Sequence, residues 1–221
     1  LQLLLSNKQV VLRQTAVATH LRKTVYILTI LFLTSMFSSA QTDWKAELKL
    51  TEYDSVLHKR IYRIQVDDYQ IVELTEFKNG EFNGSLTNSV WKANRKEYRT
   101  KLITQKIKIP NPTVEKLMTE LESEDFENIP DCKDVENCIQ GLDGTTISFS
   151  VIKNGTERNY SYWEPESDYY YKDKIIPEVL KVREILKSIN SEFNLWENFT
   201  KFRDRLPKGK YTYGMIVLEK K

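Results

Sequence analysis

Short segments with alternating hydrophobic and polar residues run through the first half of the chain. Their period of two predicts β-strands with one buried face. In segment 61–66, for example, Tyr62, Ile64 and Val66 fall on one side of the strand. The predicted strands of this kind are residues 44–50, 61–66 and 98–110. Lysines are frequent in the last of them, which favours a position at the edge of a sheet.

Two Asn-Gly pairs predict hairpin turns. Asn79-Gly80 and Asn154-Gly155 each separate two strand-like runs. An Asn-Gly pair between such runs is the strongest short-range signal for a hairpin, because both residues tolerate a positive φ. The predicted hairpins are residues 71–91 and 145–163. One further strand is predicted near the end of the chain, at residues 211–220.

Three segments in the second half repeat their apolar residues with the period of a helix. Segment 111–123 has Asn111 at the cap position and Pro112 in the first turn. Its apolar stripe is Val114, Leu117, Met118 and Leu121. Similar spacing predicts helices at residues 175–189 and 191–206. Because hairpins dominate, the sequence predicts an α+β fold: a mostly antiparallel sheet built from hairpins, with two or three amphipathic helices packed on one side.

The first 40 residues have a different composition, with four bases, no acid and an apolar run at residues 25–37 that ends in small residues. This layout predicts a secretory signal peptide over about residues 21–40, cleaved between Ala40 and Gln41. The apolar run is shorter than the ~20 residues of a spanning helix, so we expect no membrane span after cleavage. The predicted units are a leader at residues 1–40 and a single α+β domain at residues 41–221.

Charge and composition narrow the class of partner. The chain has 33 bases and 31 acids, and loss of the leader with its four bases would leave 29 against 31. The sequence therefore gives no basic excess that would indicate a nucleic-acid partner. With the export signal, it predicts a secreted or periplasmic protein.

Catalytic signatures are missing from the sequence. Outside the leader the chain has one histidine, His58, in a polar segment where we expect a solvated loop residue. There is no G-x-S-x-G, no S-x-x-K and no Gly-rich phosphate loop. An acidic segment at residues 122–143 lacks the spacing of an EF-hand, so a solvated loop is favoured and calcium binding stays open. The sequence favours a non-catalytic protein without cofactor or metal, and leaves enzymatic activity undecided.

The only two cysteines, Cys132 and Cys138, are close together in the chain. Their spacing is not the C-x-x-C of thiol oxidoreductases, and one histidine cannot complete a His-rich or Cys-rich zinc site. Since an exported protein meets oxidising conditions, the sequence predicts a structural disulfide.

An aromatic segment offers the strongest candidate for a ligand or partner surface. The residues of this candidate surface are Tyr160, Tyr162, Trp163, Tyr169, Tyr170 and Tyr171. Packing in the core is the simpler interpretation for aromatic residues at strand spacing. Two acids, Glu164 and Glu166, lie within the segment. A pair of carboxylates is what a glycoside hydrolase requires.

Three hypotheses of function follow from these patterns. The first is an exported, non-catalytic binding module for an envelope protein, a peptide or a glycan. The second is an envelope hydrolase that uses carboxylates near Glu164 and Glu166. The third is a sheet or barrel that carries an apolar ligand.

Overall fold

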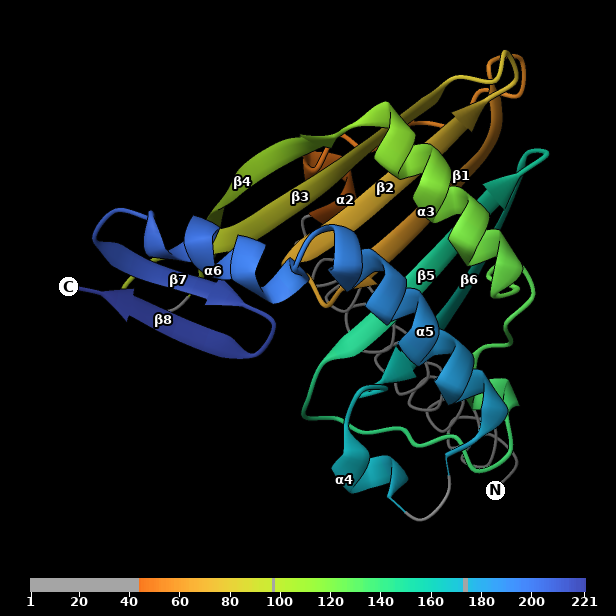
Figure 1. Cartoon of the computed structure of the whole chain (residues 1–221). Coiled ribbons are helices and arrows are strands. Elements are labelled where there is room, and N and C mark those ends of the chain that lie inside the picture. The colour runs from red at the N-terminus through yellow and green to blue at the C-terminus, as the bar shows by residue number, and fades with distance from the viewer. Residues whose placement is uncertain (1–43, 97, 173–174) are drawn as a thin grey trace, which may run out of the picture. The chain divides into compact units, whose positions relative to one another are not determined.

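The computed structural model (Figure 1) describes residues 44–96, 98–172 and 175–221. The predicted leader and its cleavage point between Ala40 and Gln41 lie outside the described residues. The strands are β1 (His58–Val66), β2 (Gln70–Phe77), β3 (Phe82–Ala93), β4 (Arg99–Ile109), β5 (Thr146–Lys153), β6 (Thr156–Trp163), β7 (Gly209–Tyr213) and β8 (Ile216–Lys220). The helices are α2 (Trp44–Glu47), α3 (Asn111–Ser123), α4 (Asp168–Tyr171), α5 (Pro177–Glu192) and α6 (Leu195–Asp204), with a 3₁₀ turn, η1, at Cys132–Asp134.

The described strands form one antiparallel sheet. Its path is β6-β5-β1-β2-β3-β7-β8, and β4 pairs with β3 beside this path. The hairpin turns predicted from the Asn-Gly pairs are present: β2 and β3 are joined at Gly80, with a φ of 84°, and β5 and β6 at Asn154-Gly155, with φ values of 54° and 75°. These positive φ angles are the reason why the sequence signal works. The prediction of a mostly antiparallel sheet built from hairpins is therefore confirmed.

Strand β3 organises the sheet because it pairs with three other strands. β4 runs along one edge of β3, from Gly84 to Ala93. β2 pairs with the first part of the other edge, and β7 pairs with Trp91–Ala93 beyond the end of β2. Among the described strands β4 pairs with β3 alone, as its lysines predicted. β6 and β8 end the path without pairing with each other, so these strands form an open sheet and no closed barrel.

Helices α3, α5 and α6 cover one face of this sheet (Figure 1). The apolar stripe predicted for α3 is buried. In α5 the buried apolar residues are Val179, Val182, Ile185, Leu186 and Ile189. They pack against Tyr62, Ile64, Val72 and Leu74 of the sheet in one core. The predicted α+β fold with amphipathic helices on one side is thus confirmed.

The opposite face of the sheet carries a smaller apolar cluster, to which residues 44–50 contribute. The prediction of a strand at residues 44–50 is wrong. Trp44–Glu47 form the short helix α2, and Leu48 N–H donates to the Trp44 carbonyl over 3.2 Å. Alternating residues at i and i+4 also share one side of a helical turn, so the period did not distinguish the two structures. Trp44 and Leu48 pack on Ile71 and Trp91 of the sheet.

The single strand predicted at residues 211–220 is in fact a hairpin of β7 and β8. Its turn contains Gly214, which has a φ of 51°. Gly214 N–H donates to Asp68 Oδ1 over 2.6 Å, which ties this turn to the loop between β1 and β2. The turn lacks an Asn-Gly pair, so the sequence signal that identified the other hairpins was not available.

His58 also departs from the expectation of a solvated loop residue. It opens β1, is buried, and packs its ring 5.1 Å from that of Phe77. Its Nδ1 accepts a hydrogen bond of 2.9 Å from the Asp54 backbone N–H. Both contacts stabilise the start of β1, so the role of His58 is structural.

Candidate functional site

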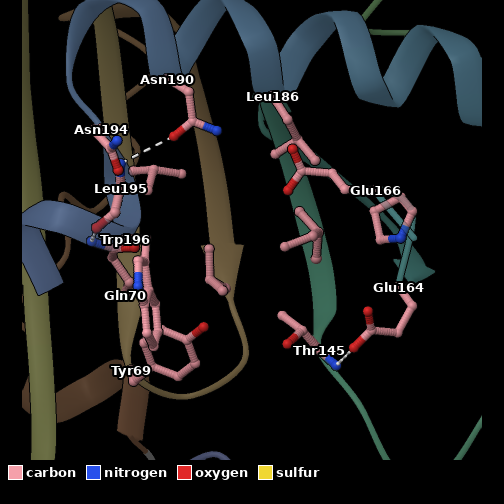
Figure 2. Close-up of a pocket in the computed structure, with 13 residues that line it drawn as sticks. Tyr69, Gln70, Thr145, Glu164, Glu166, Leu186, Asn190, Asn194, Leu195 and Trp196 are labelled. Carbon is pink, nitrogen blue, oxygen red and sulfur yellow. Dashed lines mark hydrogen bonds between the residues drawn. The ribbon is translucent and has the colours of Figure 1, made fainter. Parts of the chain in front are cut away.

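A pocket of about 490 Å³ opens at the end of the sheet where β1 turns into β2 (Figure 2). Its walls come from this turn, the start of β5, the segment after β6, the second half of α5 and the α5–α6 junction. Pockets of roughly 300–1,000 Å³ that gather a few polar groups among apolar ones are the usual sites for small ligands. The pocket is therefore the candidate site.

Two aromatic residues form one wall of the pocket (Figure 2). Tyr69 follows the β1–β2 turn and packs its ring 4.5 Å from that of Phe199. Trp196 lies in the first turn of α6, and 56% of its surface is exposed. Its ring centroid is 6.1 Å from that of Phe199, so Phe199 packs beside both rings. Arg203 lies over the Trp196 ring, with its Cζ 5.9 Å from the centroid, so a ligand would contact the part of the indole that Arg203 leaves exposed.

Two carboxylates, Glu164 and Glu166, line the opposite wall (Figure 2). Glu164 has a φ of 45°, and its backbone N–H donates to the Thr145 carbonyl over 2.8 Å. Its Oε1 accepts a hydrogen bond of 2.5 Å from Thr145 N–H. Backbone contacts on both sides thus fix this side chain at the start of β5. Glu166 follows two residues later and has no hydrogen bond or ion pair with another described residue.

The environment raises the pKa of Glu166. Desolvation of the carboxylate by the pocket walls is the main cause of the raised pKa; Arg183 opposes the shift, and the negative charge of Glu164 adds to it. Arg183 is engaged elsewhere, because its Nε donates to the Pro165 carbonyl over 2.7 Å and its Nη1 pairs with Asp168. Glu166 is consequently a carboxyl whose charge lacks a close partner.

A third acid, Asp67, belongs to the same end of the sheet. Burial raises its pKa most, and the charges of Asp68 and Glu164 raise it further, although a hydrogen bond of 2.8 Å from Thr146 N–H lowers it. The pocket itself is lined by two glutamates and by no lysine or arginine among the described residues. The lining of the pocket is therefore negatively charged, and Arg183, which lies outside it, partly offsets this charge.

Amide side chains hold the α5–α6 junction over the pocket. Gln70 Nε2 donates to the Leu195 carbonyl over 2.9 Å and to Asn88 Oδ1 over 2.7 Å. Asn190 Oδ1 accepts from Leu195 N–H over 3.0 Å, as drawn in Figure 2. Asn194 caps α6 by accepting from Glu197 N–H over 2.9 Å. These bonds join the junction to the sheet and keep Trp196 in place.

The aromatic surface expected from the sequence is largely part of the core. The buried members are Tyr160, Tyr162, Trp163 and Tyr171. Tyr160, Tyr162 and Tyr171 belong to the main core, whereas Trp163 packs against Gly141. Each of the three tyrosine hydroxyls donates to a backbone carbonyl: Tyr160 to Phe126, Tyr162 to Pro130 and Tyr171 to Trp163. Only Tyr169, 83% exposed, and Tyr170 remain on the surface. The carboxylates named beside them do line a pocket, but with Tyr69 and Trp196.

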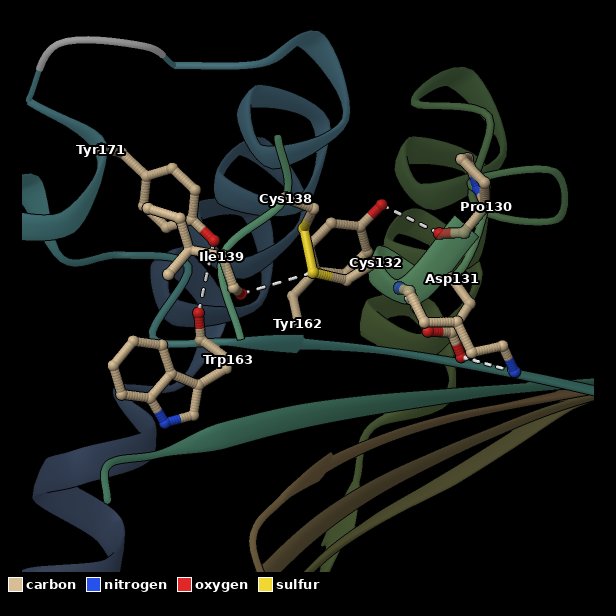
Figure 3. The surroundings of a disulfide bond; sticks show 9 residues. Pro130, Asp131, Cys132, Cys138, Ile139, Tyr162, Trp163 and Tyr171 are labelled. Carbon is tan, nitrogen blue, oxygen red and sulfur yellow. Dashed lines mark hydrogen bonds and ion pairs between the residues drawn. A yellow bond between two sulfur atoms is a disulfide. The ribbon is translucent and has the colours of Figure 1, made fainter. Parts of the chain in front are cut away.

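The predicted disulfide between Cys132 and Cys138 is present, with the Cα atoms 5.4 Å apart (Figure 3). It closes the loop that begins at η1 and leads to β5. Beyond it, Gly141 lies on the Trp163 indole so closely that a Cβ there would come within 2.3 Å of the ring. The disulfide and this contact fix the position of segment 139–144, which leads to Thr145 at the pocket.

The acidic segment before the disulfide forms ion pairs. Arg60 is almost fully buried and contacts Glu76 at 2.6 Å, Glu122 at 2.9 Å and Glu127 at 3.2 Å. The hydrogen bond from Arg60 lowers the pKa of Glu122. Lys153 is a further partner of Glu127, at 2.8 Å. Within the described ranges no group of three or more His, Cys, Asp or Glu is placed to hold a metal ion.

The signal for the missed pocket residues was weak in the sequence. Tyr69 and Trp196 are more than 120 residues apart in the chain, and no short motif connects them. No helix in the part of the chain that the structure describes is long and apolar enough to span a membrane. No protein-family model matches the chain, and no curated protein is significantly similar to it.

Proposed function

We propose that this chain is an exported, non-catalytic binding module, and that its pocket takes a basic side chain of a peptide or of an envelope protein. The observation that carries this proposal is the pairing of Glu164 and Glu166 with the exposed ring of Trp196 around one cavity. A lysine or arginine head group satisfies both features, since carboxylates attract it and an indole face binds it by a cation–π contact.

The charge of the pocket supports this choice over a neutral ligand. Glu166 has a raised pKa and lacks a close cationic partner among the described residues. A bound cation would stabilise the ionised form of Glu166 and so lower its pKa. The volume of about 490 Å³ accommodates one long side chain with part of its backbone.

Two observations support export. The leader-like composition of the first 40 residues predicts secretion, and the described part of the chain contains a disulfide. Disulfides persist in oxidising compartments and are rare in the cytosol. A periplasmic or secreted location fits both.

The test is a titration with a short blocked peptide, Gly-Lys-Gly, and with its norleucine analogue, followed by NMR chemical-shift changes. We expect the lysine peptide to bind and the analogue to bind at least tenfold more weakly. Trp196→Ala should weaken binding about tenfold, in line with a desolvated cation–π contact. Glu166→Gln should weaken it by a comparable factor. Tyr169→Ala removes an even more exposed aromatic ring outside the pocket, 83% against 56% for Trp196, and should change the affinity less than twofold.

The outcomes separate the ligand classes. Equal binding of the lysine and norleucine peptides would contradict recognition of a cation. Binding of a neutral oligosaccharide that depends on Trp196, without binding of the lysine peptide, would replace the proposed ligand by a glycan. An unchanged affinity of the Trp196→Ala variant would place the binding site elsewhere.

A hydrolase that uses Glu164 and Glu166 is the second candidate, favoured by one observation: both carboxyls line the same cavity, and the pKa of Glu166 is raised as in a general acid. The expected result is slow release of nitrophenol from nitrophenyl glycosides, reduced at least a hundredfold by Glu166→Gln. No release, or release that the variant retains, would reject this candidate and leave the binding proposal unaffected.

A further inference from the structure

The hairpin of β3 and β4 carries many positively charged residues, most of them on β4, which pairs with the edge of β3 opposite to β2. Segment 92–108 contains seven bases and a single acid. The bases are Lys92, Arg95, Lys96, Arg99, Lys101, Lys106 and Lys108, and all seven are exposed. We call these residues the basic edge. The near balance of charge over the whole chain conceals this local excess.

Most bases of the basic edge form no ion pair with an acid that the structure describes. Arg99 forms an ion pair of 2.6 Å with Asp68 and lies over the Trp91 ring. The other six bases form no ion pair with any described residue. Exposed lysines on the helices behave differently, since Lys116, Lys187 and Lys201 each contact a glutamate. In this respect the hairpin differs from helices α3, α5 and α6.

One pair within the basic edge is unfavourable in the free protein. Lys92 and Lys101 are direct partners across the β3–β4 ladder. Like charges at directly opposite positions destabilise a sheet, by up to roughly 1 kcal/mol. An anionic group bound between the two ammonium groups would convert this repulsion into attraction.

The bases of β4 follow a line. Lys101 to Lys108 span about 23 Å at the rise of an extended strand. Lys106 and Lys108 lie opposite Thr87 and Ser85 on one face, whereas Lys101 points to the other face. Lys106 and Lys108 also line a cavity of about 200 Å³ together with the Ser85 hydroxyl and the Glu73 carboxylate, which pairs with Arg63 at 2.9 Å. Ammonium and hydroxyl donors around such a space suit a carboxylate or sulfate group.

We propose that the basic edge binds a linear anionic polysaccharide, which lies along β4 and places its carboxylate or sulfate groups on these bases. A chain that follows the outer edge of β4 can contact bases on both faces of the strand. A membrane surface would require the bases in one plane, and Lys101 and Lys106 lie on opposite faces. A single-stranded nucleic acid would require stacking platforms, and among the described residues of the hairpin only Tyr98 offers an exposed ring.

The test is binding of the full chain to heparin and to polygalacturonate by calorimetry, with neutral dextran for comparison. We expect both polyanions to bind and dextran not to bind, with an affinity that falls steeply as salt rises, because bound counterions are released. The triple variant Lys101→Gln/Lys106→Gln/Lys108→Gln should lose at least tenfold in affinity and should show a shallower salt dependence.

The control removes the same charge elsewhere, as Lys116→Gln/Lys187→Gln/Lys201→Gln. It should lose less than threefold, and thermal unfolding should show that both triple variants remain folded. An equal loss in both variants would mean that net charge alone drives binding, and would overturn the proposal. Tighter binding to anionic lipid vesicles or to single-stranded DNA than to either polysaccharide would assign the basic edge to a different partner.

Discussion

The acidic pocket and the basic edge carry charges of opposite sign on different parts of the fold. The acids of the pocket lie on turns at strand ends, where backbone N–H groups of Thr145 and Thr146 fix Glu164 and Asp67. The bases of the edge lie along a strand and most have no partner among the described residues. Fixed carboxylates suit one compact cation, whereas a row of mobile ammonium groups suits an extended anion. The two regions therefore differ in backbone geometry as well as in charge.

One ion pair joins the two regions. Asp68, in the turn beside the pocket, contacts Arg99 of the basic edge at 2.6 Å. Without it the pocket would gain a further unpaired negative charge and the edge a further positive one. The predictions below alter one region at a time and ask whether the other responds.

The largest effect is expected from Gly144→Ala, which disturbs the backbone beneath the acidic wall. Gly144 has a φ of 139°, and a Cβ there would lie 2.7 Å from Glu164 Oε1 and 2.8 Å from Trp163 Nε1. We expect a loss of about 3 kcal/mol in the free energy of unfolding, since strain and steric overlap add. Urea denaturation measures it. Gly80→Ala is the control. Its φ of 84° is also unfavourable for alanine, but no atom lies within 4 Å of the new Cβ. If Gly80→Ala lost as much stability as Gly144→Ala, the contacts with Glu164 and Trp163 would not be the cause of the loss.

The turns and helices show how far local patterns reach. Asn79-Gly80 and the stripe from Val114 to Leu121 were sufficient to predict a hairpin and a helix, because each pattern satisfies its structure within a few residues. The β7–β8 turn at Gly214 was missed, since it depends on a bond to Asp68 from a distant segment. Local patterns therefore predicted the Asn-Gly hairpins and the helices, but not the β7–β8 hairpin, whose turn depends on a distant contact.

The candidate site depends on contacts that no local pattern encodes. Glu164 and Glu166 were identified as a pair, but the sequence associated them with neighbours such as Tyr160, whose hydroxyl is instead bonded to Phe126 in the core. The period of a strand gives two faces and does not say which face the helices cover. Trp196 reaches the pocket only because Gln70 holds the α5–α6 junction against the sheet.

The second prediction breaks the link between the regions with Asp68→Asn. The amide oxygen can still accept from Gly214 N–H, so the change removes mainly the charge that faces Arg99. Because Arg99 is partly exposed, we expect a loss of about 1 kcal/mol in unfolding free energy. A double-mutant cycle with Arg99→Gln should give a coupling of about 0.5–1 kcal/mol that decreases in high salt. A coupling near zero would show that the two regions are independent.

The third prediction uses Glu166→Gln to test how the charge of this side chain affects the stability of the protein. A carboxyl with a raised pKa in the folded state keeps its proton to a higher pH than in the unfolded state, so stability falls as pH rises through that interval. The variant should therefore be slightly more stable than the parent at pH 7, by less than about 1 kcal/mol because the side chain is exposed. The difference should vanish well below pH 4, where both states are protonated.

Thermal unfolding across pH measures this difference. Glu81→Gln, at an exposed position in the β2–β3 turn, is the control and should change stability little at any pH. A Glu166→Gln variant that is less stable than the parent at pH 7 would mean that the carboxylate has a favourable partner in the folded protein.

The smallest effect on stability, and the sharpest contrast between the two regions, is expected from Lys92→Glu. The substitution turns the repulsive pair with Lys101 into an attractive one, so the free energy of unfolding should rise by about 0.5 kcal/mol. The same change should weaken binding of heparin several-fold, because it reverses one charge of the basic edge. Lysine-peptide binding in the pocket should stay unchanged. A variant that gains stability while losing polyanion affinity would identify Lys92 as a residue whose charge the fold disfavours and the ligand requires, whereas a loss of both would make its role structural.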